Sequence, residues 1–146
     1  MKRRKILSVL LAVLMLITAS FATISANAAQ SGTCGDNLTW TLDDAGVLTI
    51  SGTGKMQEYK LFQTPWRSLS GVKEIIIEEG VTSISGNSFY DMIPERISIS
   101  STVETIGDKA FPKFSSILLD KNNKYFVHDE SGVLYDKNKT KIFWFE

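Results

Sequence analysis

Cysteine is nearly absent from this sequence, in which Cys34 is the only one among 146 residues. A single cysteine excludes an intramolecular disulfide, so the fold must be stabilised by an apolar core. We expect Cys34 to be a small buried or half-buried thiol, and pairing with a cysteine of another molecule is the lesser alternative.

A hydrophobic run long enough to span a bilayer, about 20 residues, is also absent. The longest apolar stretch, Ile6–Ile17, follows four basic residues at positions 2–5 and precedes the small residues of Ala26–Ala28. This order is typical of a secretory signal peptide, which we place at residues 1–28. We therefore expect a protein that is secreted or held at the cell surface, with no membrane span after cleavage.

Basic clusters are missing from the rest of the chain. The 118 residues after position 28 contain 12 Lys and Arg against 16 Asp and Glu, a net charge of −4. This length fits one small domain. A mildly acidic domain without a basic cluster is a poor candidate for binding nucleic acid or an anionic membrane.

Motifs that carry chemistry are equally scarce. His128 is the only histidine, and a lone histidine in a polar segment is expected to be a solvated surface residue. Gly52–Gly54 is not followed by the Lys-Ser or Lys-Thr pair and the helix of a phosphate-binding loop. Asp136–Asn138 lacks the glycine and the final acid of a calcium loop, so we interpret it as a hairpin turn. We predict no catalytic residue, no metal and no cofactor, and thus a protein that is not an enzyme.

The sequence does contain an internal repeat. GVTSISGNSF, residues 80–89, is followed 22 residues later by TVETIGDKAF, residues 102–111. A fixed period in the twenties is typical of a solenoid, whereas two chance strands of a β-sandwich need no equal spacing. Six apolar pairs match at this offset: Ile75 and Ile97, Ile77 and Ile99, Val81 and Val103, Ile84 and Ile106, Phe89 and Phe111, and Met92 and Phe114.

Each repeat unit combines a short strand with a return leg. Ile75 and Ile77 share one face of the strand because side chains alternate, and Phe89 closes the coil. One coil leaves both of its flat faces open, so neighbouring coils must stack with parallel strands. We predict a mainly β fold with a short solenoid of about 22-residue coils over residues 72–120. Its predicted core is Ile75, Ile77, Val81, Ile84, Phe89, Ile97, Ile99, Val103, Ile106 and Phe111.

Hairpins are predicted on both sides of the repeats. Leu38–Leu42 and Val47–Ser51 alternate around a turn, which indicates a β-hairpin within an amino-terminal cap of residues 29–71. The cap ends in a loop with Trp66 turned inward. Residues 121–146 predict a closing hairpin whose last strand, Ile142–Phe145, is apolar on both faces. Either a partner covers that strand, which includes self-association, or the array continues beyond Glu146.

One family resemblance accompanies these patterns. SGTCGDNLTWTLDDAGVLTISGTGKM, followed by TPW and two VxxIxxxxF units, resembles the BspA-like leucine-rich repeat proteins of bacteria. Ile106–Phe111 matches their IGxxAF motif, and Ile84–Phe89 matches it with serine at two positions. The resemblance implies an exported or surface-displayed recognition protein without an active site, in several cases tied to adhesion.

We therefore expect a non-catalytic module that binds an extracellular protein or a cell-surface ligand with the lateral faces of its coils. Carbohydrate binding through the carboxyl-terminal aromatics is an alternative, and so is a role as the amino-terminal scaffold of a longer surface protein. The candidate binding residues are Lys73, Glu74, Glu95, Arg96, Ser98, Trp144 and Phe145.

Overall fold

The computed structural model describes residues 30–112, 116–130 and 133–144. Within these ranges the chain is mainly β, as predicted, and contains no helix. The strands are β1 (Gln30–Gly35), β2 (Leu38–Leu42), β3 (Val47–Gly52), β4 (Gly54–Lys55), β5 (Glu74–Ile77), β6 (Val81–Ile84), β7 (Arg96–Ile99), β8 (Thr105–Ile106), β9 (Ser116–Leu119), β10 (Phe126–His128), β11 (Leu134–Asp136) and β12 (Ile142–Trp144).

Some of the sequence predictions fall outside the described residues. The predicted signal peptide, residues 1–28, is among them, as are Phe114 and Phe145. Trp144 is described only as part of the backbone of β12. In the described part of the chain, no helix could cross a membrane.

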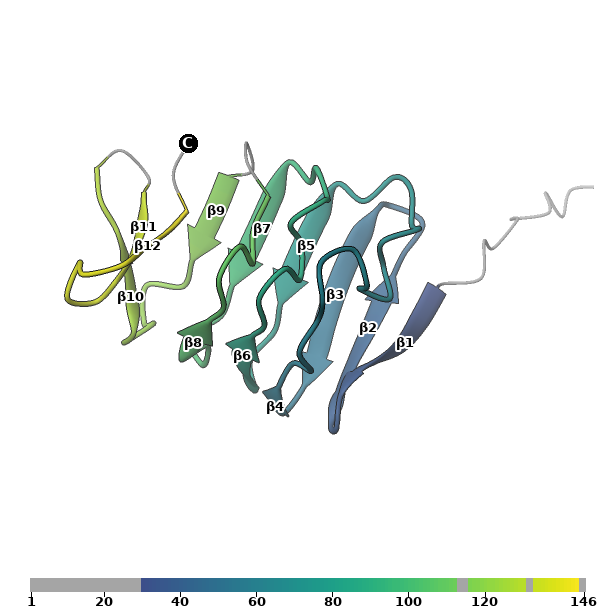
Figure 1. Ribbon diagram of the computed structural model, residues 1–146, viewed down its shortest axis with the longest axis horizontal. Helices are drawn as coiled ribbons and strands as arrows, with labels where there is room; N and C mark the ends of the chain where they lie inside the picture. Colours follow the sequence, from purple (N-terminus) through teal and green to yellow (C-terminus); the bar gives the residue numbers. More distant parts are fainter. Residues whose placement is uncertain (1–29, 113–115, 131–132, 145–146) are drawn as a thin grey trace, which may run out of the picture.

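The strands form three sheets (Figure 1). The long sheet has the order β1-β2-β3-β5-β7-β9, antiparallel from β1 to β3 and parallel from β3 to β9. A parallel sheet of short strands, β4-β6-β8, accompanies it. The antiparallel sheet β10-β11-β12 stands at the carboxyl-terminal end of this row (Figure 1).

The strand register confirms the repeat. Ile75 pairs with Ile97 and Ile77 with Ile99 in the long sheet, both at the 22-residue offset. The third strand follows after 20 residues, because Ile97 pairs with Ile117. On the return legs, β6 and β8 also pair parallel at the 22-residue offset. The repeats therefore lie side by side and point the same way.

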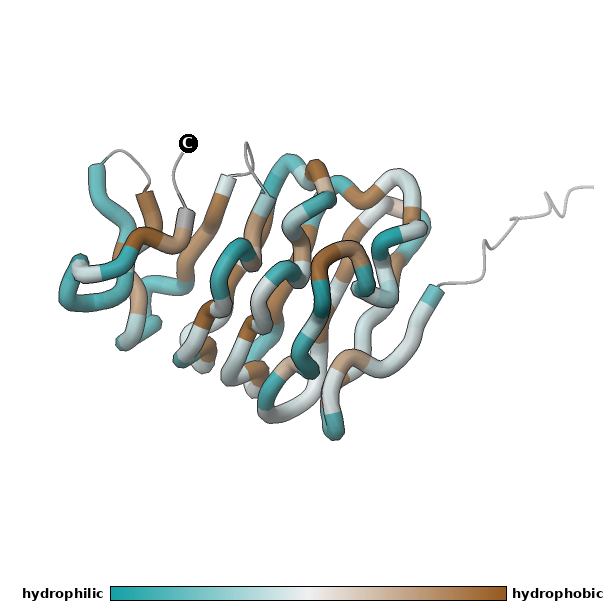
Figure 2. Tube along the Cα trace, in the orientation of Figure 1, coloured by the Kyte–Doolittle hydropathy of each residue, from teal (hydrophilic) through white to brown (hydrophobic). Residues whose placement is uncertain are grey.

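The predicted core residues fill the space between the long sheet and the return legs. All ten are buried, and none exposes more than 6% of its surface. Hydrophobic segments recur at regular intervals along the stacked strands in Figure 2. Burying such side chains contributes about 1.5–3 kcal/mol each, so stacking supplies the apolar surroundings that a single coil lacks.

The amino-terminal cap is larger than the predicted hairpin. The hairpin itself is β2–β3, as expected, but β1 adds a third strand and β3 pairs directly with β5. Trp66 is fully buried, as predicted, and its indole N–H donates to the Ser88 carbonyl at 2.8 Å. Its ring stacks on Phe89 with centroids 5.3 Å apart. The cap thus continues the repeat core without a break.

The carboxyl-terminal segment also has one strand more than predicted. The expected hairpin is β11–β12, and β10 pairs with β11 on its other side. Phe143 packs edge-on against buried Phe126 with ring centroids 5.2 Å apart, whereas Ile142 is 56% exposed. The turn interpretation of Asp136–Asn138 is confirmed, since the Asp136 carboxylate accepts hydrogen bonds from Thr140 and Lys141 across the turn.

Candidate recognition surface

The long sheet turns one face to the core and the other to solvent. Because side chains alternate along each strand, every second residue points outward. From β2 to β9, strand pairing places one outward residue of each strand side by side in a row: Thr41, Thr49, Ile76, Ser98 and Leu118. All are half-buried or exposed, and Leu118 exposes 50% of its surface. This outer sheet face is therefore an open surface about five strands wide, or ~20 Å between its outermost strands.

Hydroxyl groups dominate the amino-terminal half of the outer sheet face. Thr39 and Ser51 lie in register, with their hydroxyl oxygens 3.2 Å apart. Thr41 and Thr49 occupy the next pair of positions along the same two strands. Threonine suits a pleated and partly solvated strand surface. This half is polar but uncharged.

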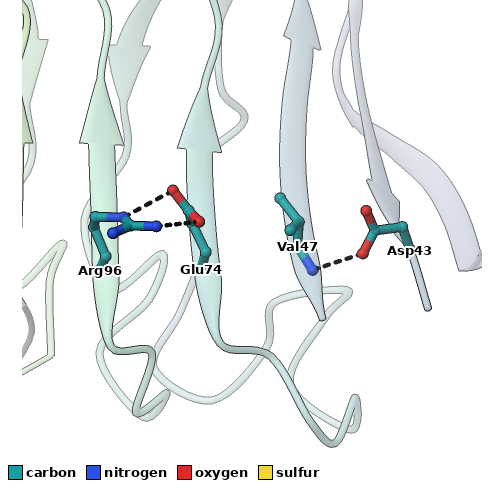
Figure 3. Close-up of polar contacts among 4 residues, drawn as sticks. All are labelled: Asp43, Val47, Glu74 and Arg96. Atoms are coloured by element: carbon teal, nitrogen blue, oxygen red, sulfur yellow. Dashed lines mark hydrogen bonds and ion pairs between the residues drawn. The ribbon is translucent and has the colours of Figure 1, made fainter. Parts of the chain in front are cut away.

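The amino ends of β5 and β7 carry a closed ion pair (Figure 3). Arg96 lies beside Glu74 in register and donates from Nε and Nη2 to the two carboxylate oxygens at 3.0 and 2.7 Å. The hydrogen bond from Arg96 lowers the pKa of Glu74, and Glu74 raises the pKa of Arg96. Asp43 accepts from the Val47 amide at 2.8 Å, which fixes the β2–β3 turn. Glu74 and Arg96 thus neutralise each other, and Asp43 is held by a backbone amide.

The carboxyl ends of β5, β7 and β9 form a shallow groove on the same face. Its lining combines apolar, hydroxyl and acidic side chains: Ile77, Glu78, Glu79, Ser98, Ile99, Ser100, Leu118, Leu119 and Asp120. The Glu79 carboxylate accepts only neutral donors from Ser101, at 3.0 and 3.1 Å, and Asp120 accepts from the Asn122 amide at 2.7 Å. None of the three carboxylates pairs with a cation among the described residues.

The structure places three of the candidate binding residues on this surface. Glu74, Arg96 and Ser98 lie on β5 and β7 and face outward. Lys73 and Glu95 precede these strands, where both are exposed and the Glu95 amide donates to the Lys73 carbonyl at 2.7 Å. The candidate side chains of Trp144 and Phe145 lie outside what the structure describes.

Apart from Ser98, the outward-facing residues that line the groove are not among the candidates from the sequence. Leu118 stands between the inward residues Ile117 and Leu119, so alternation already places it outward. Glu78 and Asp120 follow the ends of β5 and β9, and Ser100 follows the end of β7 between them. The 22-residue offset relates Glu78 to Ser100, but Asp120 follows Ser100 by 20 residues, so the fixed period alone does not bring all three together.

The structure corrects the prediction for His128. This residue is half-buried on β10, opposite Leu134, and is not a solvated loop residue. Its Nε2 atom is buried and has no hydrogen-bond partner among the described residues. Burial lowers the pKa of His128, which favours the neutral ring. The prediction failed because β10 is a three-residue strand without an alternating apolar pattern.

Cys34 is fully buried, which confirms the prediction of a buried thiol. Burial raises its pKa to about 11, so the thiol is protonated at neutral pH and is a poor nucleophile. Across the part of the chain that the structure covers, no three His, Cys, Asp or Glu side chains are grouped so that they could hold a metal ion.

One solved structure has a similar fold. It is a leucine-rich repeat protein from Eubacterium ventriosum, which superposes with a TM-score of 0.52 at 24% sequence identity. The match covers 77% of this chain and 50% of that protein, so this chain matches half the length of its neighbour. No family model matches the chain, and a search of curated proteins finds no match. The comparison shows a leucine-rich-repeat-like fold.

Proposed function

We propose that this chain is a secreted or surface-displayed, non-catalytic recognition module, built as a short leucine-rich repeat solenoid of the BspA-like type. Its ligand is an extracellular protein or a cell-surface group that binds the outer sheet face. The signal-peptide pattern of residues 1–28 supports export, and the repeat pattern supports the BspA-like type.

The observation that carries this proposal is the outer sheet face itself. It presents a continuous row from Thr41 to Leu118 at half-buried or exposed positions. The other face of the same strands holds the core, so the outer side chains lie outside the apolar layer. Side chains that differ from strand to strand on a rigid sheet are suited to recognition, because they can change the binding contacts while the backbone scaffold stays the same.

A binding experiment tests the outer sheet face directly. The purified protein is immobilised and exposed to a panel of purified extracellular-matrix proteins and to whole cells. We expect at least one of them to bind, and Thr49→Arg to weaken that binding at least tenfold because a long side chain obstructs the face. Lys60→Ala, an exposed position in the loop before β5, is the control. Binding that survives Thr49→Arg unchanged would contradict the proposal.

Export is tested separately. Expression of the full chain in a bacterium should release a product whose first residue is Ala29, as found by sequencing the amino terminus. Retention of the full chain in the cytoplasm would contradict secretion without affecting the binding test.

Carbohydrate binding is the second candidate, on one specific observation. A cleft between the last repeat and the carboxyl-terminal sheet includes Tyr125, which is 43% exposed, and half-buried Phe143. The Tyr125 hydroxyl donates to Glu104 at 3.2 Å, which holds the ring in place. Aromatic rings of this kind can stack on sugars. Glycan-array binding that Tyr125→Ala abolishes would favour this function over protein recognition.

A further inference from the structure

We propose that the groove across the carboxyl ends of β5, β7 and β9 binds a protein segment that combines Lys or Arg with aliphatic side chains. This inference rests on the proposed recognition role of the outer sheet face and specifies the chemistry of its partner.

The groove is acidic. Glu78, Glu79 and Asp120 line it, and no basic residue among those that the structure describes does. Lys121 follows Asp120 in the sequence but is not part of the lining. At the other end of the same strands, Glu74 is neutralised by Arg96 at 2.7 Å. Glu74 is thus neutralised within the molecule, whereas the carboxylates of the groove keep negative charge available to a partner.

The spacing of the carboxylates suits an extended segment. The Ser100 hydroxyl donates to the Glu78 carbonyl, and the Asp120 amide donates to the Ile99 carbonyl, so the three strand ends are neighbours. Strands lie about 4.8 Å apart, which separates Glu78 from Asp120 by about 10 Å. Residues i and i+2 of an extended chain lie on one side about 6.6 Å apart, and residues i and i+4 about 13 Å apart. Long Lys or Arg side chains at i and i+4 can therefore reach Glu78 and Asp120, while residue i+2 faces the groove between them.

The apolar part of the groove selects for aliphatic side chains between the charges. Leu118 exposes 50% of its surface on β9, and half-buried Leu119 lies beside it in the lining. Covering such a surface removes apolar area from water at about 25 cal/mol per Å². A purely charged ligand would leave Leu118 exposed. Acidic partners would meet three uncompensated carboxylates, and electrostatic repulsion would exclude them.

Synthetic peptides provide a defined probe. The purified protein is titrated with three blocked peptides, and binding is measured by calorimetry at 50 and 500 mM salt. Each peptide has two four-residue repeats, which place every second side chain on one side: Lys-Ser-Leu-Ser (the Lys-Leu peptide), Glu-Ser-Leu-Ser (the Glu-Leu peptide) and Lys-Ser-Ser-Ser (the Lys-Ser peptide). We expect the Lys-Leu peptide to bind most tightly, the Lys-Ser peptide at least threefold more weakly, and the Glu-Leu peptide not at all. High salt should weaken the Lys-Leu complex because it screens surface charges.

Two matched variants locate the site. Glu78→Gln combined with Asp120→Asn should weaken Lys-Leu binding about tenfold, as expected for removing two exposed charge contacts. Asp36→Asn combined with Asp44→Asn removes the same charge at exposed positions outside the groove and should change the affinity less than twofold. Leu118→Ser should weaken the Lys-Leu peptide and leave the Lys-Ser peptide unchanged. Circular dichroism checks that each variant is folded.

The outcomes separate this inference from the proposed function. Equal binding of the Lys-Leu and Glu-Leu peptides, or equal loss in both double variants, would overturn the basic-segment proposal. If a matrix protein then still depends on Thr49, the outer sheet face remains the recognition surface and only the partner chemistry is wrong. If Thr49→Arg has no effect either, both proposals fail.

Discussion

The inner face of the long sheet repeats one kind of side chain, whereas the outer face changes from strand to strand. Along one inner row, β3, β5, β7 and β9 contribute Leu48, Ile75, Ile97 and Ile117. The outer row beside it contains Thr49, Ile76, Ser98 and Leu118. The same four strands therefore hold a uniform aliphatic layer on one side and a variable surface on the other.

This difference separates the requirements of folding from those of recognition. An inner residue must fill a space bounded by the coils on either side, so its size and apolar character are fixed. An outer residue meets water and its register neighbours, so many side chains are tolerated. Substitutions on the inner face should act on stability, and those on the outer face should act on binding.

The largest expected effect is at Phe111, which is 6% exposed at the end of a repeat. Phe111→Ala should lower the free energy of unfolding by about 3–5 kcal/mol, because it removes a buried ring and leaves a cavity. Urea unfolding of the purified protein measures the change. Phe62→Ala is the control, since Phe62 is 44% exposed. Equal stability of the two variants would contradict the stacked core.

Asn123 is a polar exception within the buried layer, at 5% exposure. Its side-chain amide donates to the carbonyls of Ser100 and Val103, each at 3.0 Å, and its oxygen accepts from the Tyr125 and Phe126 amides. Asn123→Ala should cost about 2–3 kcal/mol, because buried carbonyl and amide groups lose their partners. The exposed Asn122→Ala should have little effect on the same unfolding curve.

Gly107 marks the tightest contact between two repeats. A β-carbon at this position would lie 2.2 Å from the Gly86 nitrogen, which belongs to the backbone of the preceding repeat. Gly107→Ala should destabilise the protein by about 1–3 kcal/mol, because the backbone cannot yield as a side chain can. Gly86→Ala would place its β-carbon 3.0 Å from the Asp108 carbonyl and should cost less. Thermal unfolding of both variants tests this order.

The Cys34 thiol is expected to have a smaller effect on the free energy of unfolding, and this effect depends on pH. Burial raises its folded pKa to about 11 from an ordinary value of 9.0, so only the unfolded chain loses this proton between those pH values. Stability should therefore fall as pH rises from 9 to 11, and Cys34→Ala should make the fall shallower. Part of the slope should remain, because burial also raises the pKa of Tyr59. Urea unfolding at pH 8 and pH 10.5 provides the comparison, and identical slopes would contradict a buried thiol.

The inner face explains how much of the fold could be predicted from the sequence. Ile75 and Ile97 are both isoleucine because each coil needs an apolar side chain of similar size at this core position. The 22-residue offset alone predicted that their strands pair in parallel. β1 was missed because QSGTCG has no alternating apolar pattern, and its place depends on pairing with β2. β10 was missed because Phe126 is the only buried residue of this three-residue strand.

The site could be predicted only in part, because outer residues follow no repeated rule. Glu74 and Arg96 were found from their positions beside the core isoleucines, but their mutual neutralisation depends on the register between β5 and β7. The groove required three strand ends to be brought together, and one of these strands deviates from the period by two residues. Surface chemistry of this kind becomes visible only in three dimensions.

The central claim is that inner residues of the long sheet determine stability and outer residues determine binding. Its most direct test measures both properties on one outer variant, Ser98→Arg. Ser98 is half-buried between Ile76 and Leu118 in the outer row. We predict a melting temperature within about 2 °C of the parent protein, as for a surface substitution of less than about 0.5 kcal/mol, together with at least a tenfold loss of affinity for the bound matrix protein. Unchanged affinity in a protein that melts much earlier would contradict the account.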